Sequence, residues 1–248
     1  MNPLFFLHGF TGSKYSWNEI QHLVKFKTHA IDLPGHGKNY FKSLSNNYSF
    51  KNWDQEFLSI LNNTKVDKIN LCGYSMGGRL AISFATAFPE KVNSLILISS
   101  TAGLLNNSEN KNRLIQDNKL SKDIELDYNK FIDNWENLDF FSKQKLRNPN
   151  GFIRQRVIRK SQNPQQLALS LQNLGLGNMP NYWNDIPYFN FPVLIICGDE
   201  DKKYNKISSQ LHSKINNSII KIIPNSGHAP QIDQPIITSK LIQKFIKS

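Results

Sequence analysis

The residues Gly73-Tyr74-Ser75-Met76-Gly77 form a G-x-S-x-G pattern between an apolar run, Ile69–Cys72, and a stretch with helical spacing, Arg79–Phe88. A sharp turn from strand to helix needs small residues around its central serine, because the backbone is strained there and neighbouring chains approach closely. The two glycines of the pattern supply that room. Such a turn places the serine hydroxyl at a helix N-terminus, where free N–H groups and the helix dipole favour negative charge. The pattern therefore predicts a reactive serine, and an incidental serine in a glycine-rich turn is the less favoured alternative.

The same succession of apolar run, turn residues and helical spacing recurs along the chain. Strands that alternate with helices form a parallel sheet with helices on both faces, and functional residues then gather at the carboxyl ends of the strands. The sequence thus predicts an α/β fold with a mostly parallel central sheet. The six expected strands are Leu4–Leu7, Thr28–Ile31, Ile69–Cys72, Leu95–Ile98, Val193–Ile196 and Ile219–Ile223.

The alternation stops between about Leu104 and Pro187, where strand-like runs are absent and the apolar residues are spaced as in helices. Gly103 precedes this segment, and prolines lie where the chain is expected to return to the sheet. We expect residues 104–187 to form a helical cap inserted into a core made of residues 1–103 and 188–248.

Composition excludes several classes of protein. The 248 residues are 39% apolar and 11% aromatic, which is too much apolar bulk for a disordered chain. No apolar run approaches the roughly 18 residues that span a bilayer, and the first residues lack the basic region of a signal peptide. We therefore expect a soluble protein that does not act on membranes.

The net charge of +11 comes from 30 Lys+Arg against 19 Asp+Glu. The lysines are scattered and form no basic tail or nucleic-acid motif, so we expect no nucleic-acid partner. Cys72 and Cys197 are the two cysteines, and each closes an apolar run before a glycine. A disulfide framework is implausible for such a chain, which favours a cytoplasmic location. The sequence leaves open whether the protein is a monomer or a homodimer.

A serine hydroxyl is a poor nucleophile or base unless an imidazole takes its proton and a carboxylate orients that imidazole. His228 lies in a loop beside Gly227, after the last expected strand, and is placed for this task. The loop after Val193–Ile196 offers Asp199, Glu200 and Asp201, and spacing alone does not choose among them.

An oxyanion hole needs two backbone N–H donors, one after the nucleophile and one after the first strand. Met76 and Phe10 occupy these positions. His8 and His36 lie in glycine-rich turns, and we expect them to shape loops rather than to take part in catalysis. The sequence shows neither clustered metal ligands nor a dinucleotide fingerprint, so no metal or organic cofactor is expected.

Arg79 lies four residues after Ser75 and therefore on the same helix face, one turn along. An arginine cannot shed its proton, so a buried one needs an anionic partner. A substrate with several carboxylates would meet that need, whereas a neutral ester would not. An ordinary ion pair is the alternative.

Taken together, these segments resemble the α/β-hydrolase superfamily and, within it, one narrow family: 2-succinyl-6-hydroxy-2,4-cyclohexadiene-1-carboxylate synthases of menaquinone and phylloquinone biosynthesis. The resemblance covers essentially the whole chain, and the cap segments and Arg79 make it specific. The matching segments are Leu7–Ser13, Asp32–Gly37, Gly73–Ala81, Phe131–Trp135, Asn163-Pro164 and Leu174–Pro180.

The resemblance implies roles for individual residues. It makes Asp201 the triad acid, with Asp199 as the runner-up. It implies a carboxylate-binding role for Arg79 and for two cap arginines, Arg113 and Arg159. Because Arg154 and Arg156 lie close to Arg159, the alignment leaves open which of the three reaches the pocket. Tyr74 and Trp135 match positions that line the pocket of the family.

The resemblance also implies the reaction. Pyruvate is eliminated from a cyclohexene that carries a succinyl side chain, a ring carboxylate and an enolpyruvyl group, three carboxylates in all. Ser75 would act as a base without forming an acyl-enzyme. A serine carboxylesterase or carbon–carbon hydrolase with the same triad remains the alternative, and a noncatalytic binding protein of the same fold is less favoured.

Overall fold

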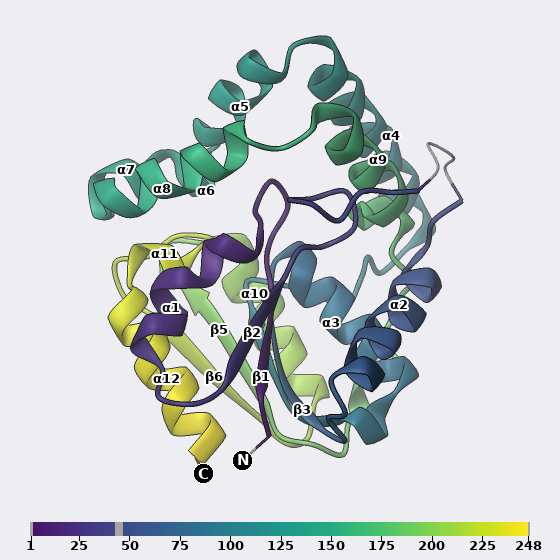
Figure 1. Cartoon of the computed structure of the whole chain (residues 1–248), viewed down its shortest axis with the longest axis vertical. Helices are drawn as coiled ribbons and strands as arrows, with labels where there is room; N and C mark the ends of the chain where they lie inside the picture. The colour runs from purple at the N-terminus through teal and green to yellow at the C-terminus, as the bar shows by residue number, and fades with distance from the viewer. Residues whose placement is uncertain (1, 43–46, 248) are drawn as a thin grey trace.

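The computed structural model describes residues 2–42 and 47–247, so that Met1, residues 43–46 and Ser248 of the predicted core lie outside the described residues. Its centre is a six-stranded parallel sheet with the strand order β2-β1-β3-β4-β5-β6 (Figure 1). All six expected strands are present, and the predicted fold class is confirmed. The strands are β1 Leu4–Leu7, β2 Thr28–Ile31, β3 Ile69–Tyr74, β4 Val92–Ile98, β5 Val193–Gly198 and β6 Ser218–Ile223.

The strand order places a switch point beside β1. The chain leaves β1 toward β2 on one side and then returns to β3 on the other, with Leu7 of β1 paired to Gly73 of β3. At such a point the loops that follow the two neighbouring strands turn away from each other and open a crevice at the carboxyl edge. Because β1 and β3 are paired, the loops that carry Phe10 and Ser75 begin side by side and flank this crevice.

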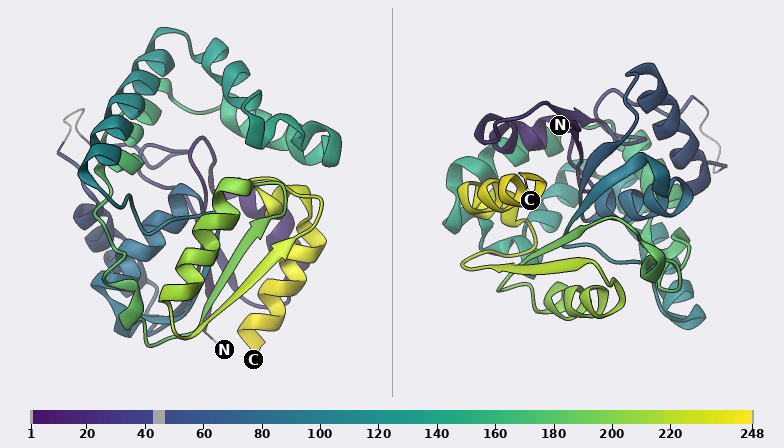
Figure 2. Two further views of the ribbon diagram at one scale, coloured as in Figure 1. Left: turned by 180° about the vertical axis from the view of Figure 1, so that it is seen from behind. Right: turned by 90° about the horizontal axis from the view of Figure 1, so that it is seen from below.

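Helices cover both faces of this sheet, as Figures 1 and 2 show. Successive side chains of a strand point to opposite faces, so Phe5 and Leu7 join one buried cluster while Leu4 and Phe6 join the other. The first cluster includes side chains of α2, α3 and α10, and the second includes side chains of α1 and α12. The helices of the core are α1 Asn18–Leu23, α2 Phe50–Asn63, α3 Met76–Ala87, α10 Lys202–Lys214, α11 Pro230–Asp233 and α12 Pro235–Lys247, with short 3-10 helices η1 Lys14–Trp17 and η2 Pro89–Lys91.

Helix α3 differs from the expected Arg79–Phe88 at both ends. It begins at Met76 because Ser75 is its N-cap residue, so the turn passes directly into the helix. It ends at Ala87 because Phe88 precedes Pro89, and a residue before proline is driven out of the helical region. The earlier start places the first free N–H groups of the helix beside the serine.

Between β4 and β5, residues 99–192 contain helices and no strand. Figure 1 shows these helices above the carboxyl edge of the sheet. Residues from α4, α5 and α9, such as Ile124, Phe131 and Leu167, form a buried cluster of their own. The cap helices are α4 Asn107–Leu126, α5 Tyr128–Glu136, α6 Asp139–Ser142, α7 Gln144–Arg147, α8 Pro149–Lys160 and α9 Pro164–Leu174, followed by η3 Leu176–Asn178 and η4 Ile186–Tyr188.

The last part of the predicted insertion packs with the core rather than with the cap. Leu176, Met179, Trp183 and Ile186 are buried in the same cluster as the sheet-face residues of α2 and α3. The cap boundaries at residues 104 and 187 stay a prediction. The packing of these side chains shows that the chain rejoins the core soon after α9.

Two further observations concern the chain as a whole. In the part of the chain that the structure describes, no helix has the length and apolar character needed to cross a bilayer. Cys72 and Cys197 are both buried and unpaired thiols.

Candidate active site

The serine of the G-x-S-x-G pattern lies on a strained turn between β3 and α3. Ser75 has φ 50°, in the left-handed region that non-glycine residues seldom adopt. A Cβ atom on Gly77 would lie 2.3 Å from the carbonyl oxygen of Leu7, so only glycine lets the start of α3 approach β1 this closely. The Ser75 N–H donates to the carbonyl of Ile98 at 2.9 Å, which fixes the turn to β4. The predicted reason for the glycines is thus visible in the packing.

His228 and Asp201 complete a hydrogen-bonded chain with this serine. The Nδ1–H of His228 donates to Oδ2 of Asp201 at 2.6 Å, and Nε2 of His228 accepts from the Ser75 hydroxyl at 3.1 Å. Asp201 and His228 are about 95% buried, and Asp201 also accepts the Tyr204 N–H at 3.1 Å as the N-cap of α10. An ionised carboxylate can only accept, so it selects the imidazole tautomer whose Nε2 is free to take the serine proton.

The other two acids of the same loop have different partners. Oδ1 of Asp199 accepts the Ser226 N–H at 3.1 Å, so Asp199 shapes the loop that carries His228. Glu200 points toward the cap and pairs with Lys143 and Arg147. The geometry therefore favours Asp201 over Asp199 as the acid of the triad.

The two expected oxyanion donors lie beside the serine. Met76 is the first residue of α3, and Phe10 lies in the loop after β1, whose register with β3 places it at the turn. Among the described residues, no group accepts a hydrogen bond from the N–H of Phe10 or of Met76. Both N–H groups are therefore available to a substrate oxygen.

A cavity of about 500 Å³ opens over Ser75 and His228, between the core and the cap. Its size suits a small organic molecule. Its wall combines aromatic, aliphatic and charged side chains. The lining residues are Phe10, Tyr74, Ser75, Arg79, Arg113, Leu120, Trp135, Asp139, Phe141, Leu171, Leu176, Glu200, Asp201, Lys202, Lys203, Tyr204 and His228.

Arg79 is a buried cation at this wall. Its side chain is 7% exposed and donates to the carbonyl of Leu174 at 3.0 Å, and within the described ranges no carboxylate lies within ion-pair distance of it. Burial lowers the pKa of Arg79 to about 10, and the nearby charge of Arg113 acts in the same direction. Arg79 is still protonated at neutral pH. A buried guanidinium without a carboxylate partner, facing a cavity, is suited to an anionic ligand.

Arg113 of α4 lines the same cavity but already has a partner. Its Nε donates to Oδ1 of Asp117 at 2.8 Å, one turn along the helix, and the buried Asp117 also accepts the Gly177 N–H at 3.0 Å. Asp117 holds the Arg113 side chain at the rim, which leaves the terminal guanidinium nitrogens for other acceptors.

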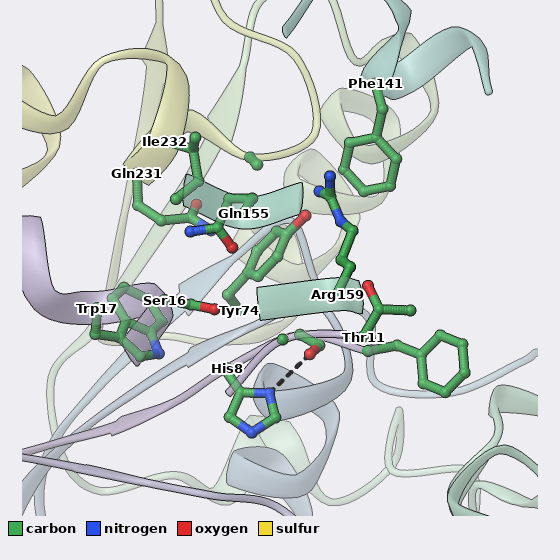
Figure 3. Close-up of a pocket in the computed structure, with 14 residues that line it drawn as sticks. His8, Thr11, Ser16, Trp17, Tyr74, Phe141, Gln155, Arg159, Gln231 and Ile232 are labelled. Atoms are coloured by element: carbon green, nitrogen blue, oxygen red, sulfur yellow. Dashed lines mark hydrogen bonds between the residues drawn. The ribbon is translucent and has the colours of Figure 1, made fainter. Parts of the chain in front are cut away.

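Arg159 of α8 lies deeper, at a small adjoining chamber of about 30 Å³ that shares Phe10, Tyr74 and Phe141 with the main cavity. Figure 3 shows its guanidinium between the Phe141 ring and the Tyr74 hydroxyl. It is 5% exposed and pairs with Glu136 at 2.9 Å. Burial lowers the pKa of Arg159 to about 10.

Neither of the two neighbouring arginines lines the main cavity or the adjoining chamber. Arg154 is half-exposed and pairs with Glu19 of α1. Arg156 pairs with Glu136 and with Asp133. Of the three candidates, the geometry thus brings Arg159 to the site.

Aromatic side chains enclose the hydrogen-bonded chain of Ser75, His228 and Asp201. Tyr74, beside the serine, has its ring 5.5 Å from the His228 ring, and Trp135 of α5 packs edge-on against Phe10 with 5.6 Å between the ring centres. Two further aromatic residues of this enclosure carry no clear signal in the sequence. Tyr204 of α10 has its ring centre 4.5 Å from that of His228, and Phe141 of the cap lies at 5.9 Å. The one hint for Tyr204 is its position three residues after Asp201.

His8 and His36 stabilise loops, as expected. His8 accepts the Leu33 N–H at 3.0 Å, and His36 accepts the Thr11 N–H at 3.3 Å. Both are fully buried, and burial lowers the pKa of His8 to about 4 and that of His36 to about 3. Both rings are therefore neutral near pH 7. The part of the chain that the structure describes contains no group of three or more His, Cys, Asp or Glu side chains arranged to hold a metal ion.

Comparisons with known proteins agree with this architecture. The family model for the α/β hydrolase fold matches residues 2–235. A Bacillus subtilis protein provisionally named 2-succinyl-6-hydroxy-2,4-cyclohexadiene-1-carboxylate synthase is 36% identical, over 98% of this chain and 89% of its own length. A pimeloyl-[acyl-carrier protein] methyl ester esterase of Wigglesworthia glossinidia brevipalpis is 30% identical, over 98% of this chain and 93% of its own length.

Among solved structures, MenH from S. aureus superposes with a TM-score of 0.94 at 30% identity, over 99% of this chain and 93% of that one. The agreement extends over core and cap together, since so little of either chain is left out. With the fold model matching nearly the whole length, and with the Bacillus subtilis relative this similar, the chain belongs to the α/β-hydrolase fold family and, within it, to the 2-succinyl-6-hydroxy-2,4-cyclohexadiene-1-carboxylate synthases.

Proposed function

We propose that this chain eliminates pyruvate from 2-succinyl-5-enolpyruvyl-6-hydroxy-3-cyclohexene-1-carboxylate to give 2-succinyl-6-hydroxy-2,4-cyclohexadiene-1-carboxylate. One observation carries the proposal beyond family membership. Arg79, a buried cation with no carboxylate partner among the described residues, faces the same cavity as the Ser75–His228 pair. A substrate with three carboxylates supplies the missing anion, and a neutral substrate does not.

Proton abstraction begins the reaction. The Ser75 hydroxyl removes the proton next to the succinyl ketone while Nε2 of His228 accepts the hydroxyl proton, and Asp201 stabilises the resulting imidazolium. The electron pair left behind forms an enolate. Its oxygen receives hydrogen bonds from the N–H groups of Phe10 and Met76, the second of which lies at the positive end of α3.

In the elimination step, the negative charge of the enolate passes to the leaving group. As the ketone re-forms, the electron pair moves through the ring double bond and breaks the bond between the ring and the enolpyruvyl oxygen. Pyruvate leaves as its enolate and takes up one proton to become pyruvate. The proton that His228 gained can be returned in this step, so one proton is taken and one is given back.

The carboxylates are bound by cations from three helices. Arg79 of α3 lies nearest the serine along the chain, Arg113 of α4 at the rim, and Arg159 of α8 beside Tyr74 at the adjoining chamber. Their planar guanidinium groups allow paired hydrogen bonds to a carboxylate, which fix its orientation as well as its charge. Trp135 and Tyr74 provide the apolar wall against which the ring is held.

The direct test supplies the purified protein with the proposed substrate and measures pyruvate formed over time, with a Ser75→Ala variant as the blank. We expect pyruvate release from the parent and none above the blank from the variant. If the parent releases no pyruvate although its serine reacts with an organophosphonate, the triad is intact and the lyase proposal is wrong.

A carboxylesterase is the second candidate, because the esterase of Wigglesworthia glossinidia brevipalpis is 30% identical over nearly the whole chain. In that reaction Ser75 attacks an ester carbonyl and forms an acyl-enzyme. A burst of alcohol release from a small neutral ester, without pyruvate release from the proposed substrate, would favour this reading.

Location inside the cell belongs to the same proposal. Two buried cysteines without a disulfide suit a reducing compartment. We therefore place the enzyme in the cytoplasm.

A further inference from the structure

Tyr204, the third residue of α10, has a fixed ring and a hydroxyl group without a protein partner. Its N–H donates to Asp201 at 3.1 Å, and its ring centre lies 4.5 Å from that of His228. The side chain is partly buried and lines the main cavity. Among the described residues, no group forms a hydrogen bond with its hydroxyl. The oxygen is not enclosed by packing, so a ligand can reach it.

The other partly buried tyrosines show what such a hydroxyl ordinarily does. Three of them form hydrogen bonds inside the protein: Tyr48 with Glu56, Tyr128 with the Arg159 carbonyl, and Tyr182 with Ser83. Within the described ranges, the two without such a bond are Tyr74 and Tyr204, and both line the main cavity. Buried polar groups nearly always have a partner. A molecule bound in the cavity is therefore the natural partner of these two hydroxyls.

Two arginines lie within electrostatic range of the Tyr204 hydroxyl. Burial raises the pKa of Tyr204, and the charges of Arg79 and Arg113 act against that rise. The hydroxyl keeps its proton at neutral pH and can donate a hydrogen bond. Arg79 and Arg113 line the same cavity, from α3 and α4. Two guanidinium groups and a phenol thus border the cavity from three different helices.

The chemistry of these three donors selects an anion. A guanidinium can only donate, and Arg79 has no carboxylate within ion-pair distance among the described residues. Asp117 occupies the Nε of Arg113 and leaves its terminal nitrogens free for a ligand. A carboxylate has enough lone pairs to accept from all three side chains, and its charge offsets that of a buried cation. A neutral carbonyl group offers no such charge.

The position of Tyr204 also separates these donors from Arg159. A second cavity of about 430 Å³ adjoins the first and shares Arg113, Leu176, Lys203 and Tyr204 with it. None of these four residues lines the small chamber at Arg159. The two groups of cations therefore serve different parts of a bound molecule.

We propose that Tyr204 is a substrate-binding residue whose hydroxyl donates a hydrogen bond to the substrate carboxylate held by Arg79 and Arg113. The proposal rests on the polycarboxylate substrate of the proposed function. Because the Tyr204 ring packs on His228, this carboxylate lies on the side of the ring where the proton is removed. The enolpyruvyl group leaves from the other side. The carboxylate then stays on the ring product, and Tyr204 contributes to affinity rather than to the chemical step.

Tyr182 offers a matched control, because its hydroxyl does have a protein partner. Tyr182→Phe deletes the same atom from a partly buried ring, but it removes the contact with Ser83 and does not alter the lining of the main cavity. It should lower Tm by about 2–4 °C and leave KM unchanged. Tyr204→Phe should have the opposite pattern. Its Tm should stay the same or rise, because the deleted hydroxyl has no partner to lose in the described structure.

The experiment measures Tm, steady-state pyruvate release and the labelling of Ser75 by a neutral organophosphonate. We expect Tyr204→Phe to raise KM by about fivefold to fiftyfold with kcat within about twofold of the parent, because a bond to a charged group is lost before and during the reaction alike. Labelling should stay within about twofold, since phenylalanine keeps a ring against His228. A KM within about twofold of the parent would overturn the proposal. So would a fall in Tm as large as that of Tyr182→Phe.

Double variants show which group of cations shares the carboxylate with Tyr204. With Arg79→Ala, the loss in kcat/KM, expressed as free energy, should be smaller than the sum of the two single losses, because both changes weaken the same contact. With Arg159→Ala the losses should add, since Arg159 lies at the separate chamber. Additive losses with Arg79→Ala would contradict a shared carboxylate.

Binding without turnover keeps this test apart from that of the proposed reaction. Calorimetry gives the Kd of the proposed substrate for Ser75→Ala and for the double variant Ser75→Ala/Tyr204→Phe. We expect the second Kd to be higher by about fivefold to fiftyfold. A parent that releases no pyruvate would contradict the proposed reaction, while the ratio of the two Kd values would still decide the role of Tyr204. Equal Kd values, or no binding to Ser75→Ala, would contradict that role.

Discussion

Ser75 is held in an unfavourable backbone conformation by its neighbours. A non-glycine residue in the left-handed region costs on the order of 1–3 kcal/mol, and it persists only where the surroundings fix it. Here the bond from its N–H to Ile98 and the close approach of Gly77 to β1 provide that restraint. The packing of the sheet offsets the strain at this residue. The strained turn in return points the Ser75 hydroxyl at His228.

Ser75 and His228 are expected to act as a unit. Ser75→Ala and His228→Ala should each lower turnover by several orders of magnitude, because either change removes the proton path. Both lie on loops at the sheet edge, so thermal unfolding should shift little. The double variant should be hardly worse than either single one in pyruvate release. Losses that add across the two sites would contradict the triad.

The acid of the triad can be tested within its own loop. Asp201→Asn should cause a large loss of turnover, because an amide in place of the carboxylate no longer selects the His228 tautomer or stabilises its cation. Asp199→Asn removes only the acceptor of the Ser226 N–H and should cost less. Turnover of the two variants is the measurement, and the reverse ranking would move the assignment to Asp199.

Substitution of Arg79 distinguishes a lyase from a generic esterase with the same triad. Arg79→Ala leaves a substrate carboxylate desolvated and unpaired, at roughly 2–5 kcal/mol, or about 30-fold to several thousand-fold in kcat/KM. Arg79→Lys should recover part of that loss, and Arg113→Ala should act mainly on substrate affinity. Any hydrolysis of a small neutral ester should barely change. Pyruvate release within about threefold of the parent for Arg79→Ala would count against a polycarboxylate pocket.

At the scale of elements, the parts of the chain with strong local signals were predictable. The six strands follow from apolar runs with turn residues after them, and Ser75, His228, Phe10 and Met76 follow from their place after strands. The acid could not be chosen by spacing, because Asp199 and Asp201 share one loop and differ only in how that loop folds. The start of α3 at Met76 depends on its N-cap residue, Ser75, and its end at Ala87 depends on Pro89.

The cap was predictable as helical but not in its packing. Phe141 reaches the His228 ring, and Arg159 rather than Arg154 or Arg156 faces the site, only because of how α6 and α8 dock. Such contacts join residues far apart in the sequence, and helical spacing carries no information about them. For the same reason, the ion pair between Arg147 of α7 and Asp233 of α11 has no sequence signal of its own.

The turn between β3 and α3 can be tested through its glycine. In Gly77→Ala the new Cβ would lie 2.3 Å from a backbone oxygen of β1, so α3 or β1 must move. We expect a large fall in Tm and loss of serine labelling. Gly151→Ala is the comparison, since its closest contact is the side-chain amide of Asn148 rather than backbone; that amide can shift at the cost of its own hydrogen bonds, so we expect a smaller fall in Tm. A fall in Tm for Gly77→Ala no larger than that for Gly151→Ala would mean that the turn is not restrained as described.

At the scale of the whole molecule, buried ionisable groups make the stability of the fold depend on pH. Asp54 of α2 accepts a hydrogen bond from Ser83 of α3 at 2.8 Å, and Ser83 in turn contacts the Tyr182 hydroxyl at 2.8 Å. This polar group joins two core helices to the segment that returns from the cap. Asp54 is 6% exposed, and its other oxygen has no partner among the described residues.

Burial raises the pKa of Asp54 to about 7, and the bond from Ser83 acts against that rise. The unfolded chain releases this proton near the ordinary value of 3.8. Between these two values the folded protein keeps a proton that the unfolded chain has lost, so the contribution of Asp54 to the free energy of unfolding falls as pH rises. The slope is about 1.4 kcal/mol per pH unit. His8 and His36 have the opposite effect. Because their pKa values are lowered in the fold, the unfolded chain binds more protons than the folded protein below pH 6.5, so their contribution to the free energy of unfolding rises with pH.

Comparison of Asp54→Asn with the parent isolates the carboxyl, because the histidine contributions are common to both proteins. The free energy of unfolding of the variant, relative to the parent, should rise by up to about 2–3 kcal/mol from pH 5 to pH 7, since an amide stays neutral where the carboxyl must ionise. Urea unfolding at several pH values measures this difference. Asp67→Asn, at an exposed carboxylate, serves as the control and should follow the parent at every pH. Parallel curves for Asp54→Asn and the parent would mean that Asp54 is already ionised in the fold, with a counter-charge that holds it there.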